Sequence, residues 1–260
     1  MKRKSNQILL ALTITLSIGC SKDDSIQTKL TLEGKRVSHI FEDGELTTRY
    51  AYKTNGLLDT VHIYSQFITS GLFGIPEYND DNLLERQEYF RITSAGPVSA
   101  GSISFSYSNG LVVEYSSLSE KNTFKYENGK CIEWDRYIDD TLEEKKSFIY
   151  DPSGNIIEEL KTEYDNGELF VRIKIKYEYD SNHSPESYIY QFTPGFPTSP
   201  NNITLRTQTV IESAPGVFFE GADSKYEYEY DQDGYPIKSV KSYMSKGEWI
   251  KDTVTEYIYF

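Results

Sequence analysis

Hydrophobic and polar residues alternate with a period of two along much of this chain. Between Val171 and Tyr179 every odd position is apolar or aromatic and every even position is charged. Residues 225–231 follow the same rule, and residues 103–107 alternate apolar side chains with serine. Successive side chains of a strand point to opposite faces, so this pattern predicts strands with one packed face and one wet face.

The strands end in turns of a recurring form. An aromatic residue, any residue and a tyrosine are followed after a few positions by glycine, as in 50–56, 105–110, 124–129, 148–154 and 228–234. Residues 177–179 reach His183 without a glycine, and residues 257–259 close the chain. Glycine suits the positive φ at a hairpin tip, and Asn109-Gly110, Asn128-Gly129 and Asn166-Gly167 are strong hairpin signals. Such repetition indicates units that bury their apolar faces by stacking on one another.

Composition supports the same fold class. The chain has 22 Tyr and 13 Phe against 2 Trp and 2 Met, which favours half-buried strands over a helical bundle. We therefore predict an all-β fold, an antiparallel meander of repeated hairpins that forms one large curved sheet or an open barrel-like structure. Residues 35–260 form this domain. Three stretches rich in Gly, Pro, Ser and Asn, at 70–82, 94–101 and 192–202, are predicted to be surface loops.

The first residues predict secretion. Lys2, Arg3 and Lys4 precede a short apolar run, and Gly19-Cys20 follows it. That order is typical of a signal peptide, and the run is too short to span a bilayer. Residues 16–20 resemble the lipobox of bacterial lipoproteins, which implies a signal peptide over 1–19 and lipid on Cys20. The alternative is a plain signal peptide with an incidental cysteine.

Residues 20–34 are predicted to be a tether. Lys22, Asp23 and Asp24 lie close to the lipidation site, similar to the surface-export tag of certain Gram-negative lipoproteins. That resemblance implies an outer-membrane location with exposure at the cell surface. The alternative is an ordinary solvated linker.

The domain also resembles known families. Residues 150–155 and 230–235 are similar to the Tyr-Asp repeats of Rhs-type secreted proteins, although the spacing wanders and some glycines are missing. The combination of lipobox, acidic tag and Tyr-rich hairpins more closely resembles an uncharacterised family of gut-bacterial lipoproteins described as having a porin-like fold. The resemblance covers roughly residues 35–260 and implies no activity and no site residues.

The net charge limits which partners the chain can bind, and the cysteine content limits which disulfides it can form. Removing Lys2, Arg3 and Lys4 with the signal takes the formal net charge from −13 to −16. So acidic a chain is repelled by nucleic acid and by anionic lipid headgroups, and we exclude nucleic acid as a partner. With Cys20 lipidated, Cys131 is the remaining thiol, so no internal disulfide forms and Cys131 is predicted to be a small packed hydrophobe.

A search for catalytic and metal-binding motifs identifies no site. His39, His62 and His183 lack metal-ligand spacing and are predicted to be half-exposed strand or turn residues. The run Asp231-x-Asp233-Gly234 looks like the start of a calcium loop, but Pro236 and the lack of a later glutamate favour a turn. We expect no metal and no cofactor.

Two functions remain open. The first is a non-catalytic cell-surface lipoprotein, a binding or structural module for an extracellular glycan or protein, with Trp134, Trp249 and the tyrosines as candidate platforms. The alternative is a carboxylate-based glycoside hydrolase whose residues cannot be named among 40 acids. A cleft with two facing carboxylates would favour the enzyme. The sequence does not determine the oligomeric state.

Overall fold

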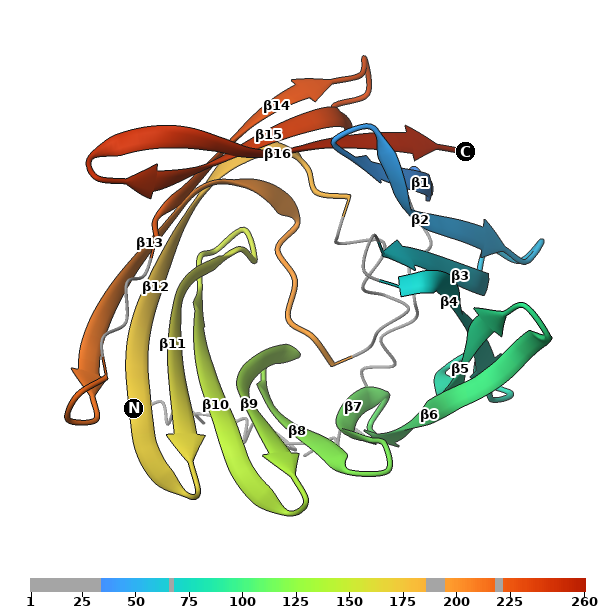
Figure 1. Ribbon diagram of the computed structural model, residues 1–260, viewed down its shortest axis with the longest axis horizontal. Coiled ribbons are helices and arrows are strands. Elements are labelled where there is room, and N and C mark those ends of the chain that lie inside the picture. Colours follow the sequence, from blue (N-terminus) through green and yellow to red (C-terminus); the bar gives the residue numbers. More distant parts are fainter. Residues whose placement is uncertain (1–33, 66–67, 186–194, 218–221) are drawn as a thin grey trace, which may run out of the picture.

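The computed structural model describes residues 34–65, 68–185, 195–217 and 222–260. These residues form sixteen antiparallel strands that follow one another around a closed barrel, in which β1 pairs with β16 (Figure 1). The strands are β1 (Val37–Glu42), β2 (Glu45–Tyr52), β3 (Leu58–Ser65), β4 (Ile68–Tyr78), β5 (Leu84–Thr93), β6 (Gly96–Ser108), β7 (Leu111–Ser116), β8 (Glu120–Glu127), β9 (Lys130–Ile138), β10 (Thr141–Tyr150), β11 (Ile156–Asp165), β12 (Glu168–His183), β13 (Asn201–Ser213), β14 (Ser224–Tyr230), β15 (Pro236–Ser245) and β16 (Glu248–Tyr259). The predicted all-β meander is confirmed, and the sheet closes completely. The described residues include no helix that is long and apolar enough to cross a membrane.

The alternation of residues sorts side chains between the lumen and the outer wall. On β12, Val171, Ile173 and Ile175 are at most 2% exposed, whereas Lys174 between them lies on the other face and pairs with Glu158. Directly paired residues of neighbouring strands share a face, so the registers carry this division around the barrel. The lumen face holds the main hydrophobic cluster, which comprises Val112, Tyr115, Phe124, Cys131, Trp134, Phe148 and Ile156.

The recurring tyrosine has a specific role in the hairpin unit. Each of five tyrosines near the end of an even-numbered strand donates its hydroxyl hydrogen to a backbone carbonyl at the start of the preceding strand. The pairs are Tyr52 to Val37, Tyr107 to Leu84, Tyr150 to Cys131, Tyr179 to Ile156 and Tyr259 to Pro236, at 2.7 to 2.8 Å. These bonds link the two strands of a hairpin at one end of the barrel.

The turns follow the sequence signals. Gly129 and Gly154 have φ of 77° and 96°, as hairpin tips require. The turn interpretation of Asp231 is confirmed, because its Oδ1 accepts hydrogen bonds from the backbone N–H groups of Asp233 and Tyr235. Cys131 is also packed as predicted, 4% exposed, and burial raises the pKa of its thiol to about 12.

The predictions for the three long loops are wrong. Most of 70–82 belongs to β4 and most of 94–101 to β6. Gly74 fits in β4 because the side chains of Gln87 and Val61 fill the space that its own Cβ would occupy. Pro76 is tolerated because β4 pairs there with β5, and the observed pairing with β3 stops at Gly74.

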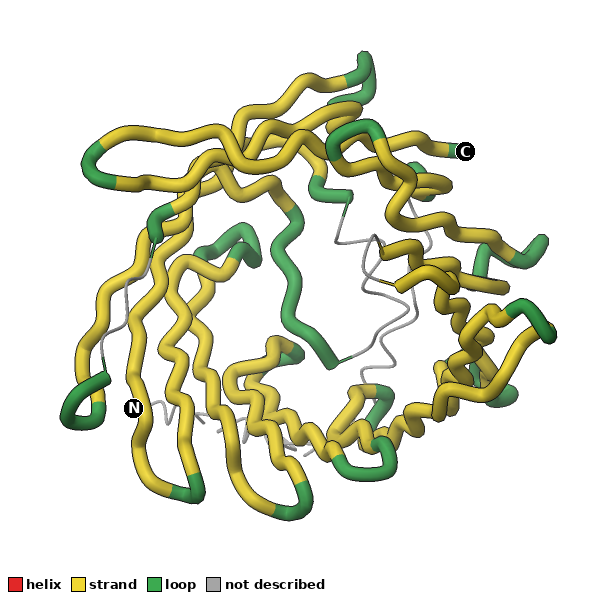
Figure 2. The backbone as a smooth tube through the Cα atoms, viewed as in Figure 1, coloured by secondary structure: helices red, strands yellow, loops and turns green. Residues whose placement is uncertain are grey.

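The third stretch, 192–202, is not a surface loop either. Its residues 195–200 run through the interior of the barrel, and β13 begins at Asn201 (Figure 2). Residues 192–194 lie outside the described residues. We call residues 195–200 the lumen strap. Its position inside the barrel makes the lumen the candidate functional site.

Candidate functional site in the barrel lumen

The lumen strap is fixed by one aromatic side chain. Phe196 packs among the rings of Tyr115, Phe124 and Trp134, with centroid distances of 5.6, 6.3 and 5.7 Å. Gly195 beside it has φ of 104°, and a Cβ there would lie 2.7 Å from the Phe124 ring. Glycine is therefore required for the close approach of the strap to β8.

Polar contacts hold the other end of the strap. The Ser199 hydroxyl donates to the Tyr179 hydroxyl and accepts from the backbone N–H of Ile156, at 2.9 and 3.0 Å. Asn201, just after the strap, accepts a hydrogen bond from the Asn155 side-chain amide at its Oδ1. Its backbone N–H donates one to Asn155 Oδ1. The strap is thus held on the lumen wall by ring packing at Phe196 and by hydrogen bonds at Ser199.

A cavity of about 240 Å³ lies beside the strap. Eight of its nineteen lining residues are aromatic and seven are polar or charged. The lining includes Trp134, Lys146, Phe148, Glu159, Tyr177, Tyr179, Phe196, Thr198, Asn202, Tyr226, Tyr228 and Tyr257. Its volume is slightly below the range of roughly 300–1,000 Å³ for drug-sized ligands, so it suits a small molecule or a single ring of a larger one.

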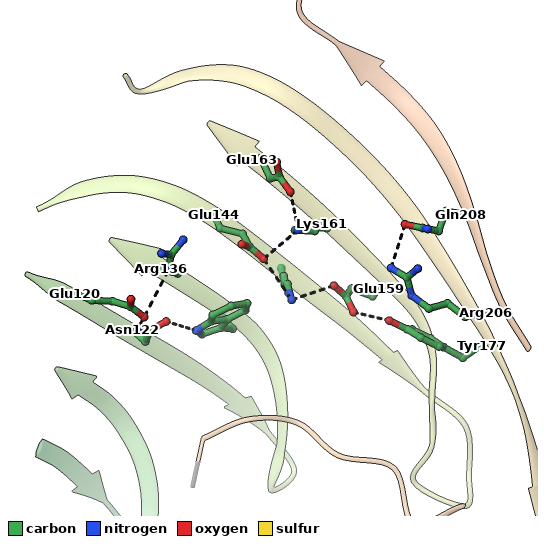
Figure 3. Close-up of polar contacts among 12 residues, drawn as sticks. Glu120, Asn122, Arg136, Glu144, Glu159, Lys161, Glu163, Tyr177, Arg206 and Gln208 are labelled. Carbon is green, nitrogen blue, oxygen red and sulfur yellow. Dashed lines mark hydrogen bonds and ion pairs between the residues drawn. The ribbon is translucent and has the colours of Figure 1, made fainter. Parts of the chain in front are cut away.

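Next to the cavity, charged and amide side chains cross the lumen face from β8 to β13 (Figure 3). We call this set the lumen polar band. It comprises Glu120, Asn122, Trp134, Arg136, Glu144, Lys146, Glu159, Lys161, Glu163, Tyr177, Arg206 and Gln208. Four carboxylates face four cations in this band, so its formal charges cancel.

Lys146 is the centre of the band. Its Nζ lies 4.5 Å from the Trp134 ring centroid, 3.3 Å from Glu144 and 3.4 Å from Glu159. Tyr177 donates to the other oxygen of Glu159 at 2.8 Å. Burial, together with the charge of Glu159, raises the pKa of Tyr177, so this phenol stays a hydrogen-bond donor at neutral pH.

On β8 and β9 the band continues through amide contacts. The Trp134 indole N–H donates to Asn122 at 2.8 Å, and the Asn122 amide donates to Glu120 at 2.8 Å. Arg136 lies 3.5 Å from the same carboxylate. These bonds hold the Trp134 ring in one orientation, with Lys146 over one face.

One buried acceptor at the cavity has no partner. Asn202 is 2% exposed and donates through Nδ2 to Asp180, but its Oδ1 accepts no hydrogen bond from any described residue. An unpaired buried amide oxygen costs about 1–3 kcal/mol. A donor group on a bound molecule would remove that cost.

The arrangement does not suit glycoside hydrolysis. Glu144 and Glu159 share one lysine, and Glu159 accepts a second hydrogen bond from Tyr177. A glycosidase needs two carboxyl groups that face a substrate across a cleft, whereas these two are engaged by side chains of the lumen wall.

The structure separates the residues that the sequence singled out. Trp134 lies in the lumen, whereas Trp249 is 38% exposed near the β15–β16 turn. His39 and His62 lie on β1 and β3, one on each side of β2, whereas His183 ends β12, and no group of metal-ligating side chains occurs in the described ranges. Cys20, Lys22, Asp23 and Asp24 lie outside the described residues.

Sequence reasoning missed the lumen polar band. On β10 and β11 charged residues occupy both faces, as in 143–146 and 158–163, so no alternation marks which side chains point inward. Register alone decides that Lys146 and Glu159 face the lumen while Lys145 and Glu158 face outward. The aromatic-x-Tyr repeat was a usable signal for the lumen tyrosines, but it does not reveal the cavity.

Comparison with known proteins gives a likeness of fold. No protein-family model matches the sequence, and no curated protein matches it. Solved structures similar to it include a porin-like protein from Bacteroides vulgatus, 12% identical with a TM-score of 0.46, over 86% of this chain and 99% of that one. A porin-like protein from Bacteroides uniformis is 10% identical with a TM-score of 0.41, over 77% of this chain and 96% of that one.

A weaker likeness is to the Tc holotoxin pore of Photorhabdus luminescens. That match is 10% identical with a TM-score of 0.31, and it covers 81% of this chain and 14% of that one. Both Bacteroides structures are described as porin-like, which agrees with the resemblance stated for the Tyr-rich hairpins.

Proposed function

We propose that this chain is a non-catalytic lipoprotein of the outer-membrane surface, whose barrel stands in water on its lipidated tether and binds a small polar ligand, a saccharide by preference, in its lumen. The observation that carries the ligand proposal is the aromatic cavity bordered by the lumen polar band. Sugar rings offer apolar faces to aromatic side chains and hydroxyl groups to amides and ion pairs. A protein ligand would not enter a cavity of about 240 Å³.

The outer wall supports a barrel that stands in water. Lys125 and Lys145 both pair with Glu133 on the outer face of β8 to β10, Lys174 pairs with Glu158 on β11 and β12, and Lys238 pairs with Glu229 on β14 and β15. A bilayer-spanning barrel turns an apolar band about 25 Å tall toward lipid, and a lysine at its middle costs about 2–4 kcal/mol. Water accommodates these ion pairs without that cost.

Ligand binding is testable by filling the cavity. We expect the chain from residue 20 onward to bind a neutral disaccharide from a panel of maltose, cellobiose and lactose in isothermal titration calorimetry. Thr198→Phe, on the cavity wall, should abolish the heat of binding. Thr209→Phe, which places the same ring on the outer face of β13 opposite Lys174, should leave it unchanged.

Two outcomes would contradict this proposal. Absence of binding across the panel would rule out a saccharide as the ligand. Equal binding by Thr198→Phe and wild type would rule out the cavity as the binding site. Circular dichroism of the three proteins shows that each has kept its β structure.

A further inference from the structure

A row of aromatic and cationic side chains crosses the outer face of β1 to β5. The strand registers pair His39 with Arg49, Arg49 with His62, His62 with Phe73, and Phe73 with Phe90. His62 stacks on Phe73 with a centroid distance of 5.6 Å, and Phe73 stacks on Phe90 at 5.1 Å. We call these five residues the outer ladder.

The outer ladder faces away from the lumen. Val61, the neighbour of His62, is 7% exposed and packs with Tyr52, one of the five hairpin tyrosines, and a Cβ on Gly74, the neighbour of Phe73, would contact Val61. Both positions therefore point inward. Apolar residues on the same outer face extend the surface, with Ile75 38% and Ile92 39% exposed. Arg49 is exposed and forms no ion pair with a described carboxylate.

This arc of the wall contrasts with the remainder. From β8 to β15 the outer face carries the ion pairs of Lys145, Lys174 and Lys238. On β5 the ion pair of Arg86 with Glu88, which lies opposite Ile75, borders the outer ladder, and the five ladder residues themselves include no carboxylate. In a chain with a net charge of −13, the five ladder residues carry one formal positive charge, on Arg49, and no negative one. Phenylalanine rings beside an arginine suit the interface between headgroups and acyl chains, where the rings bury apolar area and the cation contacts anionic lipid.

The position of the tether argues for the same partner. Residues 20–34 join the barrel at β1, the strand that carries His39, and β2 beside it carries Arg49. Fifteen residues span at most about 50 Å when extended, so a lipid on Cys20 holds this side of the barrel near the bilayer.

We infer that the outer ladder is a membrane-docking surface, which lays the β1–β5 side of the barrel on the lipid headgroups while the acidic remainder faces away. This inference rests on the proposed lipid anchor only for the approach to the membrane. The contacts themselves, between rings or Arg49 and an anionic headgroup, need no covalent lipid.

The test uses the chain from residue 20 onward with Cys20→Ser, which keeps every strand pair and carries no lipid. Co-sedimentation with vesicles of phosphatidylethanolamine and phosphatidylglycerol should show binding. Arg49→Glu removes one cation and adds one anion at the surface, which should weaken binding roughly tenfold to thirtyfold. Phe73→Ser should weaken it as well, and Arg49→Glu serves as the variant that leaves the stacked rings intact.

The matched control is Lys174→Glu on the opposite arc, which makes the same change in net charge and should leave vesicle binding unchanged. Failure of the unlipidated chain to bind, or equal weakening by both charge reversals, would overturn the docking surface. So would a dimer in light scattering that Arg49→Glu converts to a monomer, since the ladder would then join two copies. None of these results bears on whether Cys20 is lipidated, which a fatty-acid probe on the full chain reports separately.

Discussion

At the residue scale, tyrosine occurs where phenylalanine would fill the same space. The ring contributes to the lumen core, and the hydroxyl satisfies a backbone carbonyl at the start of the neighbouring strand, as Tyr150 does for Cys131 at 2.7 Å. Burial raises the pKa of Tyr150, so its hydroxyl keeps its hydrogen through the physiological range. In each of these hairpins the bond links the two strands at the open end, away from the turn.

Loss of this hydroxyl should destabilise the barrel. Tyr150→Phe leaves the Cys131 carbonyl buried without its donor, which should lower the free energy of unfolding by about 1–3 kcal/mol. Urea denaturation measures the difference. Tyr137→Phe removes a hydroxyl from the outer wall, where the ring lies beside Lys121, and should change stability by less than about 0.5 kcal/mol. Equal losses in the two variants would show that the bond to the carbonyl contributes nothing.

At the element scale, β12 shows how far alternation predicts a strand. Val171, Ile173 and Ile175 were assigned to the packed face and Lys174 to the wet face, and their burial confirms this. The same reasoning could not place β10 and β11, since charges on both faces hide the period. It also misplaced β4, because Gly74 and Pro76 are usual in loops and are accepted here through the specific contacts of Gln87 and β5.

The two faces of β12 should differ in their response to mutation. Ile173→Ala removes buried methyl groups and should cost about 2–5 kcal/mol. Lys174→Thr loses one partly exposed ion pair and should cost less than about 0.5 kcal/mol. Chemical denaturation of the two variants gives the comparison. If Lys174→Thr proved as damaging as Ile173→Ala, the outer face of this strand would not be a solvated one.

The hairpin turns can be tested by mutation as well. Gly129 is suitable because only its backbone conformation opposes a substitution. Its φ is 77°, and a Cβ there would meet no atom within 4 Å, so substitution is opposed by the backbone alone. Gly129→Val should cost about 1–3 kcal/mol through strain. A thermal shift measures this cost, with Gly129→Asn as the control, because asparagine tolerates positive φ. Tolerance of valine equal to that of asparagine would contradict the turn assignment.

At the scale of the whole molecule, closure of the barrel was not readable from the chain. Each hairpin signal reports contacts between neighbours in sequence, whereas closure depends on the pairing of β1 with β16, whose residues lie more than 200 positions apart. The lumen strap has the same origin. Its Gly and Pro residues predict irregular backbone correctly, but only the aromatic pocket made by Tyr115, Phe124 and Trp134 explains why Phe196 lies inside.

The proposed location of the molecule rests on residues that precede the barrel in the sequence. If Lys22, Asp23 and Asp24 direct export, protease added to intact cells should degrade the wild type and spare a variant with all three replaced by alanine. A matched variant with Ser25, Gln27 and Thr28 replaced by alanine keeps the tag and the tether length, so it should be degraded like the wild type. Because the strands begin at Val37, neither change should alter the stability of the purified barrel, which urea denaturation checks. Equal degradation of all three proteins would remove the tag as the export signal, and equal protection of all three would place the barrel on the inner side of the outer membrane.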